Sequence, residues 1–295
     1  MTATILDGKA LAKTIREEIA VEVAEFKEKR GFPPTIAVVE AGEDPASVSY
    51  ARRIKRSFEG KGMGVELHVL RETASQEDMV KLVGELSADK GVHGIIIQEP
   101  LPKGMDEGAV KAALSPDKDV DGAHPLNAGR LAQAPFIDRS ENAPPYFVPA
   151  APLGGLEILK RYHIQIDGQQ AVIVGANNLI GKPMAFLLVQ NWATVTICDL
   201  HTSPLSEMTR RADILCSCTG VTHLIKAEMI KPGAVVIDFG FTRVGDKWMG
   251  DVDFEAAQEV AGAITPVPGG TGAVTTAMLM KNVLEAARRQ VGWKE

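Results

Sequence analysis

Helix and strand patterns alternate along this chain in two series, and this alternation restricts its fold more than any other feature. In the first series the helical patterns cover 11–31, 47–60 and 75–89, and the apolar, strand-like runs cover 35–42, 64–70 and 92–98. Strands that alternate with helices favour a parallel sheet with helices on both faces. We therefore expect a doubly wound α/β domain in the first half.

A proline-rich stretch at 135–155, "PFIDRSENAPPYFVPAAPLGG", predicts a loop or linker after the first series. The alternation then restarts with strand-like runs at 169–175, 194–199, 213–218 and 234–240, which predicts a second, Rossmann-like doubly wound domain. The last helical pattern, 273–295, is long enough to pack back on the first domain. The expected organisation is a first domain of 1–148 with helix 273–295, a second domain of 149–272, and a cleft between them.

Composition excludes several classes of partner and site. The net charge of −6 argues against nucleic acid and anionic membranes, since both favour a basic surface. No apolar run reaches the ~18 residues that a membrane span needs, and the charged segment 1–18 lacks the apolar core of an export signal. We expect a cytoplasmic protein without a metal site, because its cysteines, Cys198, Cys216 and Cys218, form no C-x-x-C pair and fit buried core positions.

A glycine-containing turn follows the first strand of the second series. "AVIVG" leads into "GANNLIGKP", in which Gly175 ends the strand and Gly181 begins a helix near Pro183. Glycines at these places permit a tight turn and let a pyrophosphate approach the helix N-terminus. The spacing is G-x5-G and not G-x-G-x-x-G, so an ordinary strand-to-helix turn is the alternative. We expect a dinucleotide here, contacted also by Asn177, Asn178, Ile180, Thr219 and Gly220.

The next strand ends in Asp199, 24 residues after Gly175. A carboxylate there accepts hydrogen bonds from both ribose hydroxyls of NAD and repels the additional phosphate of NADP. The alternative is a solvated charge at a strand end. Together with the glycine turn, Asp199 favours NAD as the cofactor.

Five segments then share one resemblance: "GEDPASVSY", "GIIIQEPLPKGMD", "KDVDGAHPLNAGRL", "GANNLIGKP" and "ITPVPGGTGAVTTAMLMKN". In this order they resemble the methylenetetrahydrofolate dehydrogenase/cyclohydrolase family, the bifunctional FolD proteins, over nearly the whole chain. The resemblance implies an oxidoreductase of one-carbon metabolism with a folate substrate and a homodimeric assembly. It also implies that the first domain and the last helix hold the folate, and that the second domain holds the nicotinamide cofactor.

The resemblance also assigns roles to single residues. Tyr50 resembles the tyrosine that stacks against folate, Gln98 the glutamine beside the reacting carbon, and Asp121 the carboxylate that holds the pterin through two N–H groups. Gly269 and Gly270 resemble the loop that closes over the substrate. Each has a structural alternative: Asp121 could cap the turn in "DKDVDG", and Gln98 could simply end a strand.

Two departures from the family pattern concern catalysis. The pattern has a catalytic lysine four residues after the tyrosine, where this chain has Ile54, and Lys55 is displaced by roughly 100° around the helix. The pattern's "QLPLP" is "QEPLP" here, which places Glu99 near the folate pocket. Hydride transfer from methylene-tetrahydrofolate needs positioning but no proton acceptor, whereas hydrolysis of the methenyl product needs an acid/base group. Isoleucine cannot supply one.

The sequence therefore predicts an NAD-dependent methylenetetrahydrofolate dehydrogenase that has lost the cyclohydrolase reaction. A bifunctional enzyme in which Arg53, Lys55 or Glu99 carries the proton is the first alternative. A non-catalytic paralogue that binds folate or NAD is the second. Glu99 also leaves open a different one-carbon carrier.

Overall fold

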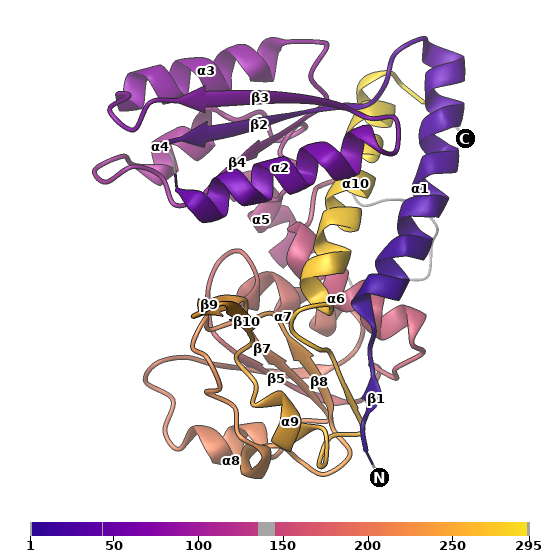
Figure 1. Cartoon of the computed structure of the whole chain (residues 1–295), viewed down its shortest axis with the longest axis vertical. Coiled ribbons are helices and arrows are strands. Elements are labelled where there is room, and N and C mark those ends of the chain that lie inside the picture. The colour runs from indigo at the N-terminus through magenta and orange to yellow at the C-terminus, as the bar shows by residue number, and fades with distance from the viewer. Residues whose placement is uncertain (1, 43, 135–144, 294–295) are drawn as a thin grey trace. The chain divides into compact units, whose positions relative to one another are not determined.

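The structure is a computed structural model that describes residues 2–42, 44–134 and 145–293 (Figure 1). The chain divides into two compact units. Unit 1 comprises Met1–Thr14, Leu131–Ala143 and Ala151–Met278, and unit 2 comprises Ile15–Arg130, Pro144–Ala150 and Leu279–Glu295. Two of the divisions fall within long helices, α1 (Gly8–Arg30) and α10 (Thr271–Gln290), so these helices contribute residues to both units.

Unit 2 contains a parallel sheet of three strands in the order β3-β2-β4. Its strands are β2 (Thr35–Ala41), β3 (Gly64–Leu70) and β4 (Gly94–Ile97), and its further helices are α2 (Pro45–Glu59), α3 (Gln76–Ala88), α4 (Glu107–Ala113) and α5 (Pro125–Gln133). The register pairs Ile36 with Val65 on one side and with Gly94 on the other. β3 is therefore an edge strand whose outer side pairs with no strand among the described residues.

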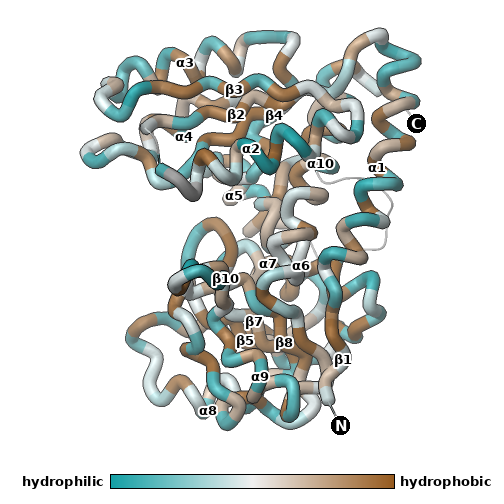
Figure 2. The backbone as a smooth tube through the Cα atoms, viewed as in Figure 1, coloured by the Kyte–Doolittle hydropathy of each residue, from teal (hydrophilic) through white to brown (hydrophobic). Residues whose placement is uncertain are grey.

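The elements of unit 2 form where the sequence patterns place them. β2 is central and buried, and alternate residues Ala37 and Val39 pack with Met79 and Val83 of α3 on one face. Figure 2 shows the strands of this sheet as predominantly hydrophobic. Ser75 and Asp78 form a reciprocal capping box at the start of α3, which satisfies two backbone donors. Because successive side chains of a strand point to opposite faces, one set of β2 residues packs on α3 and the other set faces the opposite side of the sheet.

Unit 1 contains a six-stranded sheet in the order β1-β11-β8-β7-β5-β6, and each neighbouring pair in it is parallel. Its strands are β1 (Thr4–Ile5), β5 (Gln170–Val174), β6 (Thr194–Cys198), β7 (Ile214–Ser217), β8 (Val235–Asp238) and β11 (Ala263–Ile264). The helical elements here are α6 (Ala150–Arg161), α7 (Gly181–Gln190), α8 (Leu205–Thr209), η1 (Ala227–Met229) and α9 (Phe254–Ala257). A separate antiparallel hairpin joins β9 (Thr242–Val244) and β10 (Lys247–Met249).

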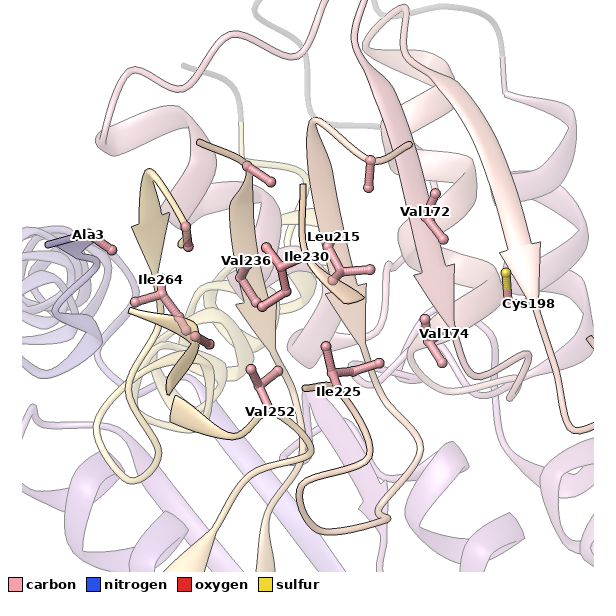
Figure 3. Packing of buried hydrophobic residues seen from close by; sticks show 14 residues of the cluster. Ala3, Val172, Val174, Cys198, Leu215, Ile225, Ile230, Val236, Val252 and Ile264 are labelled. Atoms are coloured by element: carbon pink, nitrogen blue, oxygen red, sulfur yellow. The ribbon is translucent and has the colours of Figure 1, made fainter. Parts of the chain in front are cut away.

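Neighbouring strands of this sheet supply one apolar core. Val172 and Val174 of β5, Leu215 of β7, Val236 of β8 and Ile264 of β11 form a row across it (Figure 3). The expected α/β class, with parallel sheets in two domains and a Rossmann-like second domain, is confirmed.

The predicted linker at 135–155 is wrong at its C-terminal end. Residues 135–144 lie outside the described part of the chain, but α6 already begins at Ala150. Pro152 is compatible with this helix because its first turn leaves backbone N–H groups without helical partners. Gly155 packs so closely that a Cβ there would stand 2.5 Å from Phe239 Cζ. Proline and glycine usually indicate loops. Here Pro152 lies in the first turn of α6, and Gly155 allows close packing against Phe239.

The expected domain bounds differ from the two units at more than one place. Residues 1–14 belong to unit 1 because β1 pairs with β11, with Thr4 beside Ala263 and Ile5 beside Ile264. Of the last helix, the part from Leu279 onward belongs to unit 2. There Asn282 Nδ2 donates to the backbone oxygens of Val120 at 2.7 Å and Val148 at 3.0 Å. The division at 148/149 and the cleft remain predictions.

Candidate active site

Tyr50 lies on α2 with its side chain half-buried. Burial, and then the negative charge of Asp121, raise the pKa of Tyr50 above its usual value, so the phenol stays protonated. The guanidinium of Arg53 lies over the ring, with Cζ 5.0 Å from the ring centroid. Tyr50 is therefore a fixed, neutral ring that can stack on a planar ligand.

Ile54, one turn further along α2, is 0% exposed and is one of the largest fully buried side chains of the chain. Lys55 points elsewhere, as predicted, because its Nζ approaches Glu59 Oε1 at 3.9 Å on the exposed side of the helix. Position 54 thus carries no ionisable group, and the side chain of Lys55 does not bring one to that side of the helix.

Gln98 and Asp121 come from neighbouring extended segments. The backbone N–H of Ile95 donates to Lys118 O at 2.7 Å, and Ile95 and Asp119 form an isolated parallel bridge. Since the two segments run in the same direction, the residues that follow them emerge at the same end of the sheet. Gln98 is 7% exposed, and its Nε2 has no hydrogen-bond partner within the described residues. A buried amide donor without a partner is costly unless a ligand accepts from it.

The sequence left open that Asp121 caps the turn in "DKDVDG". In the structure Asp119 makes these turn contacts instead. Asp119 accepts from the backbone N–H groups of Ala123 and His124 and from Asn127 Nδ2, at 2.9, 2.8 and 2.8 Å. Asp121 accepts from the Ala150 backbone N–H at 3.3 Å. Burial raises the pKa of Asp121 to about 7, and the Ala150 N–H acts against this shift. Asp121 is thus a carboxyl group with acceptor capacity for a ligand and a charge that changes near neutral pH.

Glu99 forms an ion pair that sequence reasoning missed. Lys111 Nζ on α4 lies 2.7 Å from Glu99 Oε1, and both side chains are partly buried. Both groups act electrostatically on Asp121. The spacing of 12 residues corresponds to no helical or strand period, so no sequence signal could have indicated this pair.

The glycine turn between β5 and α7 has no room for side chains. Gly175 has φ +114°, and a Cβ on Gly181 would stand 1.8 Å from Gly175 O. Asn177 shapes the turn: its Nδ2 donates to Cys218 O at 2.9 Å, and its Oδ1 accepts from the backbone N–H of Ile180 at 2.8 Å. Asn178 is exposed and accepts from Lys182 Nζ at 2.8 Å. The residues present therefore fit a pyrophosphate brought against the backbone.

The end of β6 presents Asp199 to solvent. The His201 N–H donates to Asp199 Oδ1 at 2.9 Å, and this hydrogen bond in particular lowers the pKa of Asp199. Leu200 beside it is 98% exposed. Thr219 instead points inward, because its backbone N–H and its hydroxyl both donate to Asp251 Oδ2. Gly220 follows at φ +70° and is exposed.

The loop before α10 packs against the start of α1 within unit 1. Gly269 has φ +114°, and its carbonyl accepts from the Lys9 N–H at 3.0 Å. A Cβ on Gly270 would stand 2.5 Å from Pro266 O. Both positions therefore require glycine for the loop to keep its path.

The cysteines are buried, and burial raises the pKa of each thiol. Within 2–42, 44–134 and 145–293 no group of three or more His, Cys, Asp or Glu side chains is arranged to hold a metal ion. The helices of this same part of the chain include none that is both long and apolar enough to cross a membrane.

Comparisons with known proteins cover both halves of the chain. Residues 6–121 match the model described as tetrahydrofolate dehydrogenase/cyclohydrolase, catalytic domain, and residues 149–291 match the NAD(P)-binding domain of the same enzymes. The chain belongs to the tetrahydrofolate dehydrogenase/cyclohydrolase family.

Individual relatives agree with this assignment. The protein named "Bifunctional protein FolD" from Chloroflexus aggregans is 47% identical over 293 residues, which cover 99% of this chain and 100% of the relative. The crystal structure of the bifunctional FolD enzyme from Campylobacter jejuni has a TM-score of 0.92 at 37% identity, covering 97% of this chain and 99% of the other. The FolD structure from Trypanosoma brucei, complexed with NADP and an inhibitor, has a TM-score of 0.92 at 34% identity and covers 99% of both chains.

Family membership establishes an enzyme of the methylenetetrahydrofolate dehydrogenase class with an NAD(P)-binding domain. In this chain, Tyr50, Gln98, Glu99 and Asp121 all lie in unit 2. Gly175, Gly181, Asp199 and Gly269 lie in unit 1. The individual roles predicted for these residues remain predictions.

Proposed function

We propose that the protein oxidises 5,10-methylene-tetrahydrofolate to 5,10-methenyl-tetrahydrofolate with a preference for NAD, and that it does not catalyse hydrolysis of the product. The observation that carries the second part is Ile54. Its side chain is fully buried and cannot ionise at the position where the family resemblance places a catalytic lysine. That this chain is a member of the family without the catalytic lysine is itself part of the proposal.

In this proposal the residues of unit 2 bind and orient the folate. An ionised Asp121 accepts from two N–H groups of the pterin, and Gln98 offers the Nε2 donor that has no partner in the described chain. Tyr50 supplies a neutral ring for stacking. The nicotinamide cofactor supplies the hydride acceptor when it is bound. No side chain needs to remove a proton, because loss of hydride leaves a stabilised cation, so positioning accounts for most of the rate.

The proposed cofactor site consists of the glycine turn and Asp199. The backbone at Gly175 and Gly181 leaves space only for glycine, and Asn177 holds the N–H of Ile180 in place. Asp199 is ionised and exposed, and the adjacent Leu200 brings no cation to a 2′-phosphate. These features support NAD over NADP.

The bifunctional enzyme is the second candidate, and the comparisons favour it. Relatives at 44–48% identity carry the name "Bifunctional protein FolD". This candidate needs a proton carrier other than position 54. Lys55 faces Glu59 on the outside of α2, a guanidinium at Arg53 stays protonated, and Glu99 is paired with Lys111. Glu99 is therefore the one of these three that has the chemistry to exchange a proton near Asp121.

One experiment separates these candidates. Purified enzyme is given methylene-tetrahydrofolate and NAD, then NADP, while NADH or NADPH and methenyl-tetrahydrofolate are followed at separate wavelengths. The proposal expects methenyl-tetrahydrofolate to accumulate in step with NADH. Hydrolysis that grows with enzyme concentration supports the bifunctional candidate instead. Absence of hydride transfer with both cofactors supports a non-catalytic paralogue, or action on a different one-carbon carrier.

We further propose that the enzyme is a cytoplasmic homodimer that pairs through the α2–β3 face of unit 2. Leu67 and Val69 on edge strand β3 are 40% and 62% exposed. They line a groove of about 940 Å³ together with Arg52 and the buried Glu40, one of whose carboxylate oxygens has no partner among the described residues. Exposed apolar edge strands with an unpaired buried carboxylate favour coverage by a second copy, whose arginines complement Glu40.

A further inference from the structure

The turn after β7, residues 218–221 (the β7 turn), lies beside the glycine turn that follows β5. The two strands are parallel neighbours, so both turns leave the same edge of the sheet. Asn177 Nδ2 of the glycine turn donates to Cys218 O at 2.9 Å, and a Cβ on Gly175 would stand 2.7 Å from that same oxygen. Because β6 lies on the other side of β5, this edge is a switch point of the strand order, where parallel α/β sheets bind ligands.

The β7 turn has backbone groups, and not the Thr219 side chain, available for a ligand. The Thr219 hydroxyl is already used, since it donates to Asp251 Oδ2 at 2.9 Å and accepts from the Val221 N–H at 3.1 Å. Gly220 is exposed, and within 2–42, 44–134 and 145–293 neither its N–H nor the Thr219 carbonyl makes a hydrogen bond. One backbone donor and one backbone acceptor suit the hydroxyl and amide groups of a dinucleotide.

Asp251 holds the beginning of the β7 turn. Its Oδ2 accepts from the Thr219 N–H at 2.6 Å as well as from the Thr219 hydroxyl. Ser217 Oγ, at the end of β7, donates to the same oxygen at 2.9 Å. Asp251 is 0% exposed, and hydrogen bonds to a carboxylate are roughly twice as strong as those between neutral groups. This side chain therefore determines the path of Thr219 and of Gly220 after it.

Asp251 is itself held in place. Its backbone N–H donates to Asp238 Oδ1 at 3.1 Å, and the Gly240 N–H donates to that oxygen at 2.7 Å. A Cβ on Gly240 would overlap Asp251 Oδ1, so this oxygen lies directly against the glycine. Asp251 Oδ1 has no hydrogen-bond partner among the described residues. The carboxyl group of Asp251 therefore makes its hydrogen bonds through Oδ2, to the end of β7 and to the β7 turn.

We propose that Asp251 is a positioning residue for the dinucleotide: it holds the β7 turn so that the backbone of Thr219 and Gly220 meets a cofactor bound at the glycine turn. This rests on the proposed cofactor site at the glycine turn. Asp251 is fully buried and acts only through the turn. The turn contributes no charge, so loss of the acceptor at position 251 weakens NAD and NADP binding by the same factor. In this respect Asp251 differs from Asp199, which discriminates between the two.

The test measures binding of NAD and of NADP to the full chain by calorimetric titration, and the KM for NAD and for methylene-tetrahydrofolate. Asp251→Ala removes the acceptor, whereas Asp251→Asn keeps one acceptor oxygen for the same donors. Thr219→Val removes the hydroxyl at similar volume, whereas Thr219→Ser keeps it. Ser217→Ala is the matched control, because it removes a hydrogen bond to the same carboxylate oxygen from β7 and not from the turn.

Asp251→Ala raises the Kd for both dinucleotides about tenfold or more, because the turn loses two hydrogen bonds to a charged group. The KM for NAD rises with it, and the KM for methylene-tetrahydrofolate is unchanged. Thr219→Val weakens binding less, and Asp251→Asn and Thr219→Ser bind nearly as the wild type does. Ser217→Ala lowers the thermal unfolding midpoint but leaves the Kd unchanged. A merely structural role of Asp251 would lower the unfolding midpoint without raising the Kd of the folded protein.

An unchanged Kd for NAD in Asp251→Ala and Thr219→Val overturns the proposal, and so does equal weakening by Ser217→Ala. If Gly181→Ala abolishes binding while Asp251→Ala leaves it unchanged, the cofactor site stands and only the role of Asp251 is wrong. A wild type that binds neither dinucleotide contradicts the proposed cofactor site together with this inference. Circular dichroism and thermal unfolding check that each variant is folded. If Asp251→Ala does not fold, the comparison of Thr219→Val with Thr219→Ser decides.

Discussion

The backbone N–H of His201 donates to Asp199 Oδ1 at 2.9 Å, and Thr202 Oγ1 approaches the same oxygen at 3.3 Å. These contacts close a short turn directly after β6 and hold the carboxylate in place while it remains exposed. The side chain that follows Asp199 is the almost completely exposed Leu200. A fixed negative charge followed directly by an uncharged leucine at this strand end is the structural basis for the expected cofactor preference.

For cofactor choice, we expect kcat/KM with NAD to exceed that with NADP by about tenfold or more, which corresponds to roughly 1.4 kcal/mol. Asp199 repels the additional phosphate, whereas the NAD ribose offers it two hydroxyl donors. Asp199→Ser combined with Leu200→Arg should move the preference toward NADP. Initial rates with both cofactors at matched concentrations check this, and equal or better turnover of the wild type with NADP contradicts it.

For the glycine turn, Gly181→Ala should abolish detectable cofactor binding and lower the free energy of unfolding by roughly 2 kcal/mol or more. The added Cβ would stand 1.8 Å from Gly175 O, which is backbone and cannot rotate away. Calorimetric titration with NAD and thermal unfolding measure the two effects.

The matched control for that variant is Gly84→Ala on α3. A Cβ at Gly84 meets nothing within 4 Å, so alanine should stabilise the helix by about 0.4–1 kcal/mol through its higher helix propensity. Cofactor binding should be unchanged. Normal NAD binding by Gly181→Ala would show that the turn adjusts and that its close contact is not part of the cofactor site.

The contrast between Asp119 and Lys111 shows which features of the site could be predicted from the sequence. The strands and the glycine turn are encoded locally, by alternation and by residue types that tolerate tight backbone, so their positions follow from short windows. The three aspartates in "DKDVDG" are indistinguishable by pattern, and only the fold shows that Asp119 takes the turn contacts. The Lys111–Glu99 pair depends on where α4 packs, which is a tertiary property. The start of α6 was missed because its proline and glycines also favour loops.

For the folate site, Asp121→Ala should cost roughly 2–4 kcal/mol in kcat/KM for methylene-tetrahydrofolate, because two charge-assisted hydrogen bonds are lost. NAD binding should be intact, since the proposed cofactor residues lie in unit 1 and Asp121 lies in unit 2. Steady-state kinetics and calorimetric titration with NAD separate the two. An unchanged kcat/KM would place the pterin elsewhere.

For assembly, Val69→Asp should convert the proposed dimer to monomer, since it would bury a charge between the paired edge strands. Light scattering coupled to size-exclusion chromatography measures the mass. Val21→Asp on α1 is the control, because Val21 is 71% exposed and is not among the residues that line the groove beside β3. A wild-type monomer at micromolar concentration, or a dimer that survives Val69→Asp, contradicts this interface.

For hydrolysis, purified wild-type enzyme should not accelerate the decay of methenyl-tetrahydrofolate above its rate in buffer. Water attack needs a group that accepts a proton and returns it, and Ile54 can do neither. Ile54→Lys would place an ammonium in a position that is now 0% exposed, where burial lowers the pKa of lysine toward the range useful for proton transfer. Some hydrolysis should then appear, at a cost of a few kcal/mol in stability.

Ile54→Met is the control for that variant, because it keeps an apolar side chain of similar volume and should restore nothing. The wild-type measurement decides the question irrespective of how well Ile54→Lys folds. If hydrolysis by the wild type increases in proportion to enzyme concentration, the monofunctional proposal is wrong and the bifunctional relatives describe this chain as well. Glu99→Gln then becomes the decisive variant, because Glu99 is a carboxyl group that directly follows Gln98 and pairs with Lys111.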